Sequence, residues 1–420
     1  MVFESNARTY PLRQPPQHNP PPRLHLVFPE AQKHVFTAYI GIQLHQKTTP
    51  NNALLQFSDA RRLIQSFLTR SKPLSTEQFI VLNDTPNHTQ KQAEYSVSNF
   101  TTNQKYTSLI WVCYWDSKEA YKQALTQLNL CSIYHSLPAP VRPATGLWVE
   151  TFVSEIARLE TVYSETDYMP GLARLPGTST TKHVHTGYWG AARDRIPGSG
   201  EDLFTGKVSF TNDDNERSED PEEEEEDNQD EVPKKPLSSL GFSMKGTNPS
   251  DMIHIRSGQF WTNCSKEEST AYIENIEPKL RNGLSYLWNN PQESGSFGVR
   301  YLRNTLLDLN SQHEHEETET ATETSNSMSN FLNSCPKESC VTAFFKNMTD
   351  LERWASEHPS HLAIHAGAIS HARRFGDTRK FRTWHEVSVI RGGEAGFEYV
   401  NCIDGTGVEC GMISVERTSL

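Results

Sequence analysis

Two histidines in the last fifth of the chain occupy very different sequence settings, and together they indicate the chemistry. His361 follows Pro359 and opens a helical stretch that is rich in small residues. His385 lies in the run 381–389, which is typical of a strand. One histidine on a small-residue helix and another on a buried strand face suit a flat cofactor that is held from one side and worked on from the other.

The surroundings of His361 favour a large planar ligand. On a helix, His361 shares a face with His365, Ala368 and Ala372, and small residues let a flat group approach the backbone. A haem with an axial histidine meets this demand. No C-x-x-C-H motif occurs, so such a haem would be held non-covalently. A surface helix with several histidines fits equally well. A zinc site at His361 and His365 would lack the glutamate of H-E-x-x-H, because position 362 is leucine.

The setting of His385 leaves two interpretations open. Alternation along the strand places His385 on one face with Thr383, Val387 and Val389. A core histidine with a satisfied hydrogen bond would fit this pattern. A proton carrier in a dry pocket would also fit, because an imidazole with an ordinary pKa of about 6.5 can both give and take a proton.

Three more polar residues are candidates for the same site. Ser257 shares a strand face with two isoleucines, where its hydroxyl needs a backbone or ligand partner. Glu160 lies on the helical stripe expected from the spacing of Phe152 and later apolar residues, and an inward carboxylate usually pairs with an arginine. Arg195 belongs to the dense cluster 185–197, which could form a salt-bridged rim or present a guanidinium to an oxygen-bearing ligand.

Hydrophobic periodicity predicts an α+β fold. Strands are expected at 35–44, 108–115, 203–211, 238–257, 382–390 and 396–403. Helices are expected at 54–68, 117–128, 152–163, 265–289, 350–357 and 360–373, with Thr349-x-x-Glu352 as a capping box for the helix at 350–357. We interpret the chain as a proline-rich mobile arm (1–30), a first α+β half (31–170), a second half (171–410) and a tail (411–420).

Charge and composition exclude several classes of protein. The net charge of the 420 residues is −12, but two acidic inserts in the second half, 213–235 and 311–330, account for the negative charge. They contain almost no apolar residues and are expected to be disordered. The remainder is slightly basic without a basic block, so no nucleic-acid partner is expected. No apolar run is long enough for a membrane span, and no signal peptide or disulfide framework is visible, so a cytoplasmic location is expected.

Five segments in order resemble the haem-containing aldoxime dehydratases. They are 159–163, 187–195, 255–259, 352–362 and 385–389, and the resemblance extends over about residues 30 to 410 without the acidic inserts. It implies two ferredoxin-like halves that form an antiparallel β-barrel flanked by helices, haem b as cofactor, and a homodimer. It also implies a lyase that converts aldoximes such as phenylacetaldoxime to nitriles.

The resemblance assigns roles to individual residues. His361 matches the axial ligand of the haem iron, and His385 matches the general acid and base. Ser257 and Arg195 match residues that handle the oxime hydroxyl, and Glu160 matches an acidic residue near that site. The oxime nitrogen would bind ferrous iron. The alternatives are a haem peroxidase or chlorite-dismutase-like enzyme on a related barrel, a non-catalytic haem protein, and a protein without haem.

Overall fold

The computed structural model describes residues 8–45, 58–82, 107–204, 238–305, 335–408 and 413–420. The segments 213–235 and 311–330 lie outside the described residues, and so does nearly all of the expected strand at 203–211. Among the described residues, no helix is both long and apolar enough to cross a membrane.

Two segments of the chain repeat one order of strands and helices. The first comprises β2 (His34–Leu44), α2 (Ser58–Ser71), β3 (Ser75–Val81), β4 (Thr107–Trp115), α3 (Lys118–Gln127), α4 (Leu130–Ser136) and β5 (Thr145–Glu155). The second comprises β9 (Met252–Phe260), α6 (Lys266–Asn275), α7 (Glu277–Asn289), α8 (Pro291–Ser294), β10 (Ser296–Asn304), β11 (Glu338–Phe345), α10 (Met348–Glu357), α11 (Pro359–Phe375) and β12 (Arg382–Ile390).

Shorter elements join and flank these two segments. The strands are β1 (Arg23–Val27), β6 (Leu159–Tyr163), β7 (Ser179–His183), β8 (Phe242–Thr247), β13 (Ala395–Val400) and β14 (Ile413–Ser419). One short helix, α5 (Ala191–Asp194), lies between β7 and β8, and single turns of 3₁₀ helix include η3 (Ile156–Arg158) and η7 (Gly376–Thr378). The expected tail therefore contains a strand, which pairs with β8.

All described strands form one antiparallel sheet in the order β14-β8-β13-β5-β2-β4-β3-β10-β11-β9-β12-β6-β1-β7. The closed barrel expected from the sequence is wrong, because this order is linear. A barrel would need β5 to pair with β12, but β13 occupies the free edge of β5 and β6 occupies the free edge of β12. The mixed helix and strand class expected from the sequence is confirmed.

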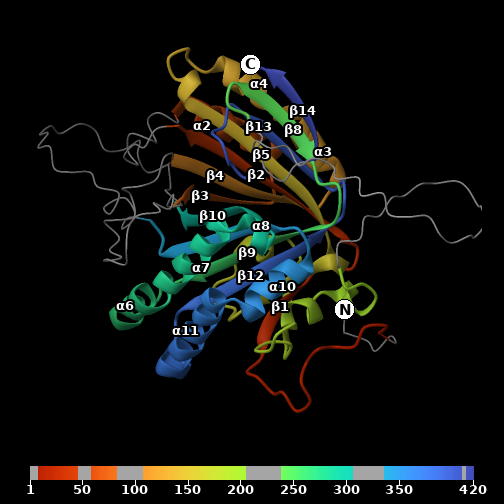
Figure 1. Ribbon diagram of the computed structural model, residues 1–420, viewed down its shortest axis with the longest axis vertical. Helices are drawn as coiled ribbons and strands as arrows, with labels where there is room; N and C mark the ends of the chain where they lie inside the picture. The colour runs from red at the N-terminus through yellow and green to blue at the C-terminus, as the bar shows by residue number, and fades with distance from the viewer. Residues whose placement is uncertain (1–7, 46–57, 83–106, 205–237, 306–334, 409–412) are drawn as a thin grey trace, which may run out of the picture.

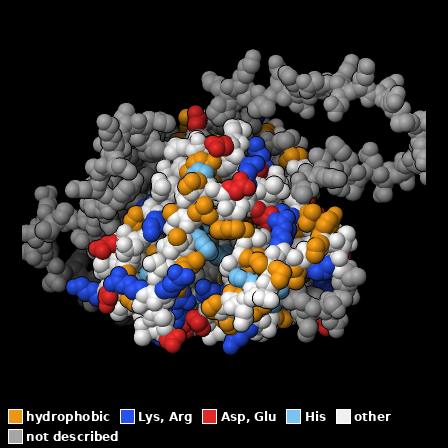
Figure 2. Space-filling view, turned by 60° about the horizontal axis from the view of Figure 1, so that its bottom comes forward, with side chains coloured by type: hydrophobic (Ala, Val, Ile, Leu, Met, Phe, Trp, Pro, Cys, Tyr) orange, Lys and Arg blue, Asp and Glu red, His pale blue; other side chains and the backbone are white. Residues whose placement is uncertain are grey.

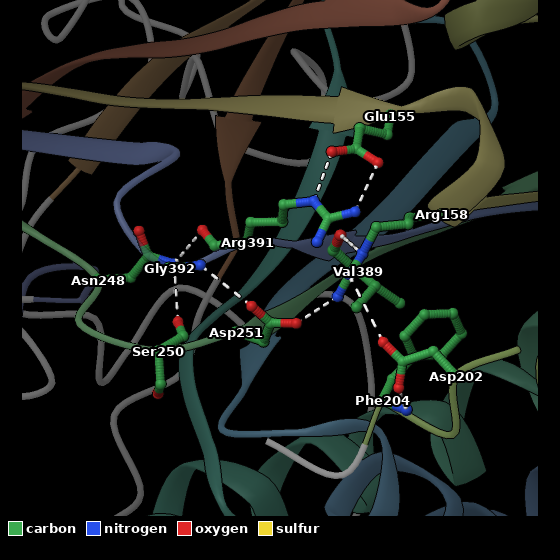
Figure 3. A network of polar contacts seen from close by, with 10 residues as sticks. All are labelled: Glu155, Arg158, Asp202, Phe204, Asn248, Ser250, Asp251, Val389, Arg391 and Gly392. Carbon is green, nitrogen blue, oxygen red and sulfur yellow. Dashed lines mark hydrogen bonds and ion pairs between the residues drawn. The ribbon is translucent and has the colours of Figure 1, made fainter. Parts of the chain in front are cut away.

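Side chains nevertheless connect β5 and β12 where the sheet curls back on itself. Ser154 Oγ donates to Ser388 Oγ at 2.8 Å, which joins the two strands without a ladder. Beyond the strand ends, Arg391 Nε donates to Glu155 Oε1 at 2.5 Å, and Arg158 pairs with Asp251. Figure 3 shows this network, which lies where β5 and β12 end.

The helices lie in two groups on the outside of the curled sheet (Figure 1). Helices α2, α3 and α4 cover β2, β4 and β5 with an apolar cluster that includes Ile64 and Trp111. Helices α7, α10 and α11 cover β9 and β12 with a second cluster that includes Leu284 and Val387. A third cluster fills the inside of the curl. The candidate site lies with the second group, on the outer face of β9 and β12.

Three expectations for local structure are wrong. The region 152–163 is not a helix: β5 runs to Glu155, and β6 follows after η3, because pairing with β2 and β12 outweighs the helical spacing of four apolar residues. The helix at 265–289 is broken at Ile276, just before Pro278. The cap of α10 is Asn347 rather than Thr349, since the Asn347 side chain accepts from Asp350 N.

Candidate active site

Three candidate residues share one face of the sheet through strand register. His385 on β12 lies directly opposite Ser257 on β9 and opposite Val162 on β6. Glu160 on β6 is the partner of Val387, two residues along β12 from His385. Directly paired residues project to the same face, as do residues two apart on one strand. His385, Ser257 and Glu160 therefore face the layer of helices α7, α10 and α11.

A tightly packed tryptophan fixes this register. Trp384, next to His385, points to the inside of the curl and lies over the backbone of Gly258, next to Ser257. A Cβ on Gly258 would come 2.1 Å from Trp384 Cε2, so only glycine fits there. The Arg256 guanidinium stacks on the same indole ring at 4.7 Å. The His385–Ser257 pair thus rests on a rigid layer.

His361 lies in the first turn of α11, on the helical side. Its Nδ1 lies 2.6 Å from the carbonyl oxygen of Ala355, so Nδ1 carries the proton and donates it. Burial is the main cause that lowers the pKa of His361 to about 4, with a smaller effect of His365. The ring is therefore neutral at pH 7 and presents the Nε2 lone pair. This tautomer and orientation are those of a metal-binding histidine.

His385 faces the same space from the sheet. Burial is the main cause that lowers its pKa to about 3, followed by the positive charges of Arg195 and Arg23 and by His361. The influence of His361 places the two imidazoles within electrostatic reach of each other. No hydrogen bond to the His385 ring or to the Ser257 hydroxyl is formed within the described part of the chain. Both polar groups are therefore available to a ligand.

Arg195 is held beside His385 by Glu160. Arg195 Nε donates to Glu160 Oε1 at 2.6 Å, and Nη1 donates to the carbonyl oxygen of His185 at 2.7 Å. Glu160 is fully buried, and burial raises its pKa although the Arg195 charge acts in the opposite direction. The carboxylate fixes the guanidinium at two nitrogens and leaves part of it for another oxygen-bearing group.

The loop that carries Arg195 also reaches the helical side. In this Arg195 loop (residues 184–196), the Trp189 ring lies 6.4 Å from His361 and 5.2 Å from His365. On the other side of His361, Trp354 of α10 lies at 4.6 Å. The Arg195 loop therefore borders the space between α11 and the sheet on both sides: Arg195 lies beside the sheet, and Trp189 lies beside α11.

The N-terminal arm packs on the Arg195 loop. The backbone N–H of Arg13 donates to Asp194 Oδ2 at 2.8 Å, and its guanidinium pairs with Glu352 of α10 at 3.1 Å. The close contact requires glycine at 190, because a Cβ there would come 2.6 Å from Arg13 Cδ. Composition gave no sign of these contacts, which only the fold brings together.

The residues between α11 and the sheet fit a haem bound by one histidine. His361 offers a free Nε2, and the facing residues Ser257 and His385 keep accessible surface and unused polar atoms. In contrast, the residues on either side of them along the strands, such as Trp384, are buried. In the described ranges, no three or more His, Cys, Asp or Glu side chains form a metal cluster, so the zinc alternative has no ligand set there.

Comparison with known proteins agrees with this geometry. The family model for haem-containing dehydratases matches residues 38–408. A phenylacetaldoxime dehydratase of Bacillus sp. (strain OxB-1) is 26% identical over 72% of this chain and 73% of its own length. An aliphatic aldoxime dehydratase of Pseudomonas chlororaphis is 25% identical over 96% of this chain and 94% of its own length. A crystal structure of an aldoxime dehydratase in complex with butyraldoxime has a TM-score of 0.70 at 23% identity, covering 97% of this chain and 94% of that one.

The fold and these comparisons define a haem enzyme of the lyase class. The chain belongs to the haem-containing dehydratase family. The resemblance seen in the sequence and the haem cofactor are both confirmed.

Proposed function

We propose that the protein dehydrates aldoximes, R–CH=N–OH, to nitriles, with His361 as the axial haem ligand and His385 as the general acid and base. The observation that carries the proposal is the opposition of the two histidines. The His361 ring is fixed by Ala355 with its Nε2 free, and His385 faces it with Ser257 and Arg195 alongside. The dehydratase relatives support the reaction type.

A bound ferrous haem would supply a coordination site for the oxime nitrogen and electron density for the weakening N–O bond. The protein would supply the remaining groups. Ser257 Oγ and the Arg195 guanidinium are positioned to hold the oxime hydroxyl and to stabilise negative charge on its oxygen. Glu160 would keep the guanidinium in place.

Proton transfer would be the task of His385. Hydroxide is a poor leaving group, so the protonated imidazole would give its proton to the hydroxyl oxygen as the N–O bond breaks, and water would leave. The neutral imidazole would then take the proton from the oxime carbon as the C≡N bond forms. The proton given and the proton taken balance, so His385 returns to its starting state and no oxidant is consumed.

The substrate class is part of the proposal. The relatives named above include an enzyme named for phenylacetaldoxime and another named for aliphatic aldoximes. We propose phenylacetaldoxime as a substrate and butyraldoxime as its aliphatic comparison. We also propose that the two repeated segments are ferredoxin-like halves, that the protein is a homodimer, and that it acts in the cytoplasm.

Anaerobic turnover tests the proposal against a haem peroxidase or chlorite-dismutase-like enzyme. The haem-loaded protein is reduced with dithionite, mixed with each aldoxime without oxygen, and assayed for nitrile. We expect nitrile from the reduced protein and little from the oxidised protein. Peroxide- or chlorite-dependent activity of the ferric protein, with no nitrile under reducing conditions, would contradict the proposal.

A further inference from the structure

A row of basic side chains continues the His385 face toward the edge of the sheet. Leu24 of β1 pairs with Tyr163 of β6, and both belong to the cluster inside the curl. Arg23 and His25, the neighbours of Leu24, therefore project to the outer face with His385. His183 of β7 is the direct partner of Arg23 and extends the same face by one strand.

Arginines from two segments meet here without a carboxylate partner. The guanidinium groups of Arg23 and of Arg379, which follows η7, form no ion pair or hydrogen bond within the described part of the chain. Burial lowers the pKa of each guanidinium, and a neighbouring arginine lowers it further: Arg379 acts on Arg23, and Arg382 acts on Arg379. Glu165 raises both pKa values, but it is exposed and does not outweigh these effects.

Arg382, in the same region, has the carboxylate partner that Arg23 and Arg379 lack among the described residues. It binds Asp167 with two nitrogens, Nε to Oδ1 at 2.5 Å and Nη2 to Oδ2 at 2.8 Å. This carboxylate raises the pKa of Arg382 above its ordinary value. The contrast indicates that Arg23 and Arg379 lack an anion that the described residues do not provide.

His183 gives an independent sign of a missing ligand. Its side chain is buried, with 7% relative exposure of the residue, and neither ring nitrogen has a hydrogen-bond partner among the described residues. It lies between two other imidazoles, with ring centroids 5.4 Å from His25 and 6.4 Å from His185. A buried donor without an acceptor is unfavourable, so an acceptor from a ligand would be favoured here.

The border of the haem space on the side of α7 and α10 is apolar. Val387 and Val389 of β12 pack with Leu284 of α7 and Trp354 of α10 in one cluster. Haem b has an apolar ring and two carboxylates, and the carboxylates need cations and donors. Apart from Arg195, the edge formed by β1, β7 and the start of β12 offers both cations and donors. Figure 2, in which the lower end of Figure 1 is turned toward the viewer, shows His, Lys and Arg side chains among hydrophobic ones on that face.

We propose that Arg23, Arg379 and His183 form the site that binds the haem propionates. This inference rests on the placement of the haem between His361 and His385. It specifies the orientation of the ring, with its carboxylate edge toward β1 and β7 and its apolar edge toward α7. The propionates would also place negative charge near His385 and so offset the Arg23 and Arg195 charges that keep its imidazole neutral.

A chemical double-mutant cycle tests the proposal without any activity measurement. The apoprotein is loaded with haem or with haem dimethyl ester, whose carboxylates are blocked, and the rate of haem transfer to excess apomyoglobin is measured. Esterification should speed loss from the wild type by about tenfold or more. In Arg23→Met combined with Arg379→Met, haem should leave about as fast as the ester does from the wild type, and esterification should have little further effect.

Arg374→Met is the matched control, because Arg374 lies nearby at the end of α11 but already pairs with Glu267 at 2.8 Å. It should behave as wild type. Equal effects of esterification in the wild type and in the double variant would overturn the proposal.

Circular dichroism of each apoprotein checks folding, and His183→Phe provides a second, uncharged variant that should also reduce the effect of esterification. Loss of haem binding in His361→Ala, measured in parallel, separates failure of the propionate site from failure of the haem site itself.

Discussion

His385 and Ser257 are direct partners in the ladder between β12 and β9, and both side chains face the helix that carries His361. A proton carrier and a hydroxyl are thus fixed side by side by backbone pairing rather than by a loop. Trp384 and Gly258, their neighbours on the inner face, interlock and prevent a shift of register. Such a pair can be altered one side chain at a time without moving the other.

His385→Ala should separate chemistry from cofactor binding. We expect the variant to keep its haem, because the axial ligand is on α11, and to lose nitrile formation by about 10²-fold or more. Ser257→Ala should lose less, about tenfold, because it removes one hydrogen bond to the leaving hydroxyl and no proton. Soret absorbance and nitrile yield are measured on the same samples. Full activity of His385→Ala would rule out its acid–base role.

The pH dependence of turnover should report the protonation of His385. Burial and the Arg195 and Arg23 charges lower the pKa of the free protein's His385 to about 3, so the acid form is scarce at neutral pH. Where the assay pH exceeds the pKa in the loaded enzyme, kcat should fall by about tenfold per pH unit, because the acid fraction falls by that factor. A kcat that rises with pH over the same range would show that the neutral ring is the reactive form.

Glu160→Gln should weaken catalysis through Arg195. The amide keeps the size of the buried side chain but loses the charge that holds the guanidinium at 2.6 Å. We expect a kcat that is about tenfold to 10²-fold lower, with haem content unchanged. Arg195→Lys should resemble it, because one ammonium cannot replace a bidentate guanidinium. The combined variant should be little worse than either alone. Fully additive losses would mean that the two residues act separately.

Removal of the N-terminal arm should loosen the Arg195 loop. Deletion of residues 1–20 removes the contacts of Arg13 and His18 with this loop, whereas deletion of residues 1–7 leaves both contacts in place. The longer deletion should lower kcat/KM by about tenfold with haem retained, and the shorter one should have no effect. Arg13→Ala alone should change kcat/KM by less than about threefold, because the ion pair between Arg13 and Glu352 is half exposed. Equal activity of the two deletions would mean that the arm does not position the loop.

Buried histidines should make stability fall in acid. His254 lies inside the curl, and burial, followed by the Arg256 and Arg300 charges, lowers its pKa to about 3. The unfolded chain therefore binds one more proton there between about pH 6.5 and pH 3, and stability is lost as pH falls through that window. In His254→Phe, which keeps the aromatic packing, unfolding free energy from urea titration should fall less steeply. The difference should reach about 1.4 kcal/mol per pH unit. His135→Gln, at an exposed position, should show no such difference.

The sequence allowed the elements of the site to be predicted, but not their relation to one another. The expected strand at 382–390 coincides with β12, and the helix that begins near Pro359 is α11. Both patterns are local: strict alternation around His385, and a proline at the first helical position before His361. Glu160 was expected on a helix, because four apolar residues happened to have helical spacing, and only pairing with β12 shows it on a strand.

The sequence could not show whether the barrel closes, nor could it show that Arg23 and His183 lie together at the edge of the sheet. Whether β5 pairs with β13 or with β12 depends on competition between strands far apart in the chain, which periodicity does not describe. Arg23 and His183 become neighbours only through the pairing of β1 with β7. Neither lies in a motif, so the lack of side-chain partners that they share among the described residues is visible only in three dimensions.

Resonance Raman spectroscopy of the reduced, ligand-free protein shows through the iron–histidine stretching band whether His361 is the axial ligand. We expect this band in the wild type and in His365→Ala, its absence in His361→Gly, and its return when imidazole is added to His361→Gly. An unchanged band in His361→Gly, or its loss in His365→Ala alone, would show that His361 is not the axial ligand.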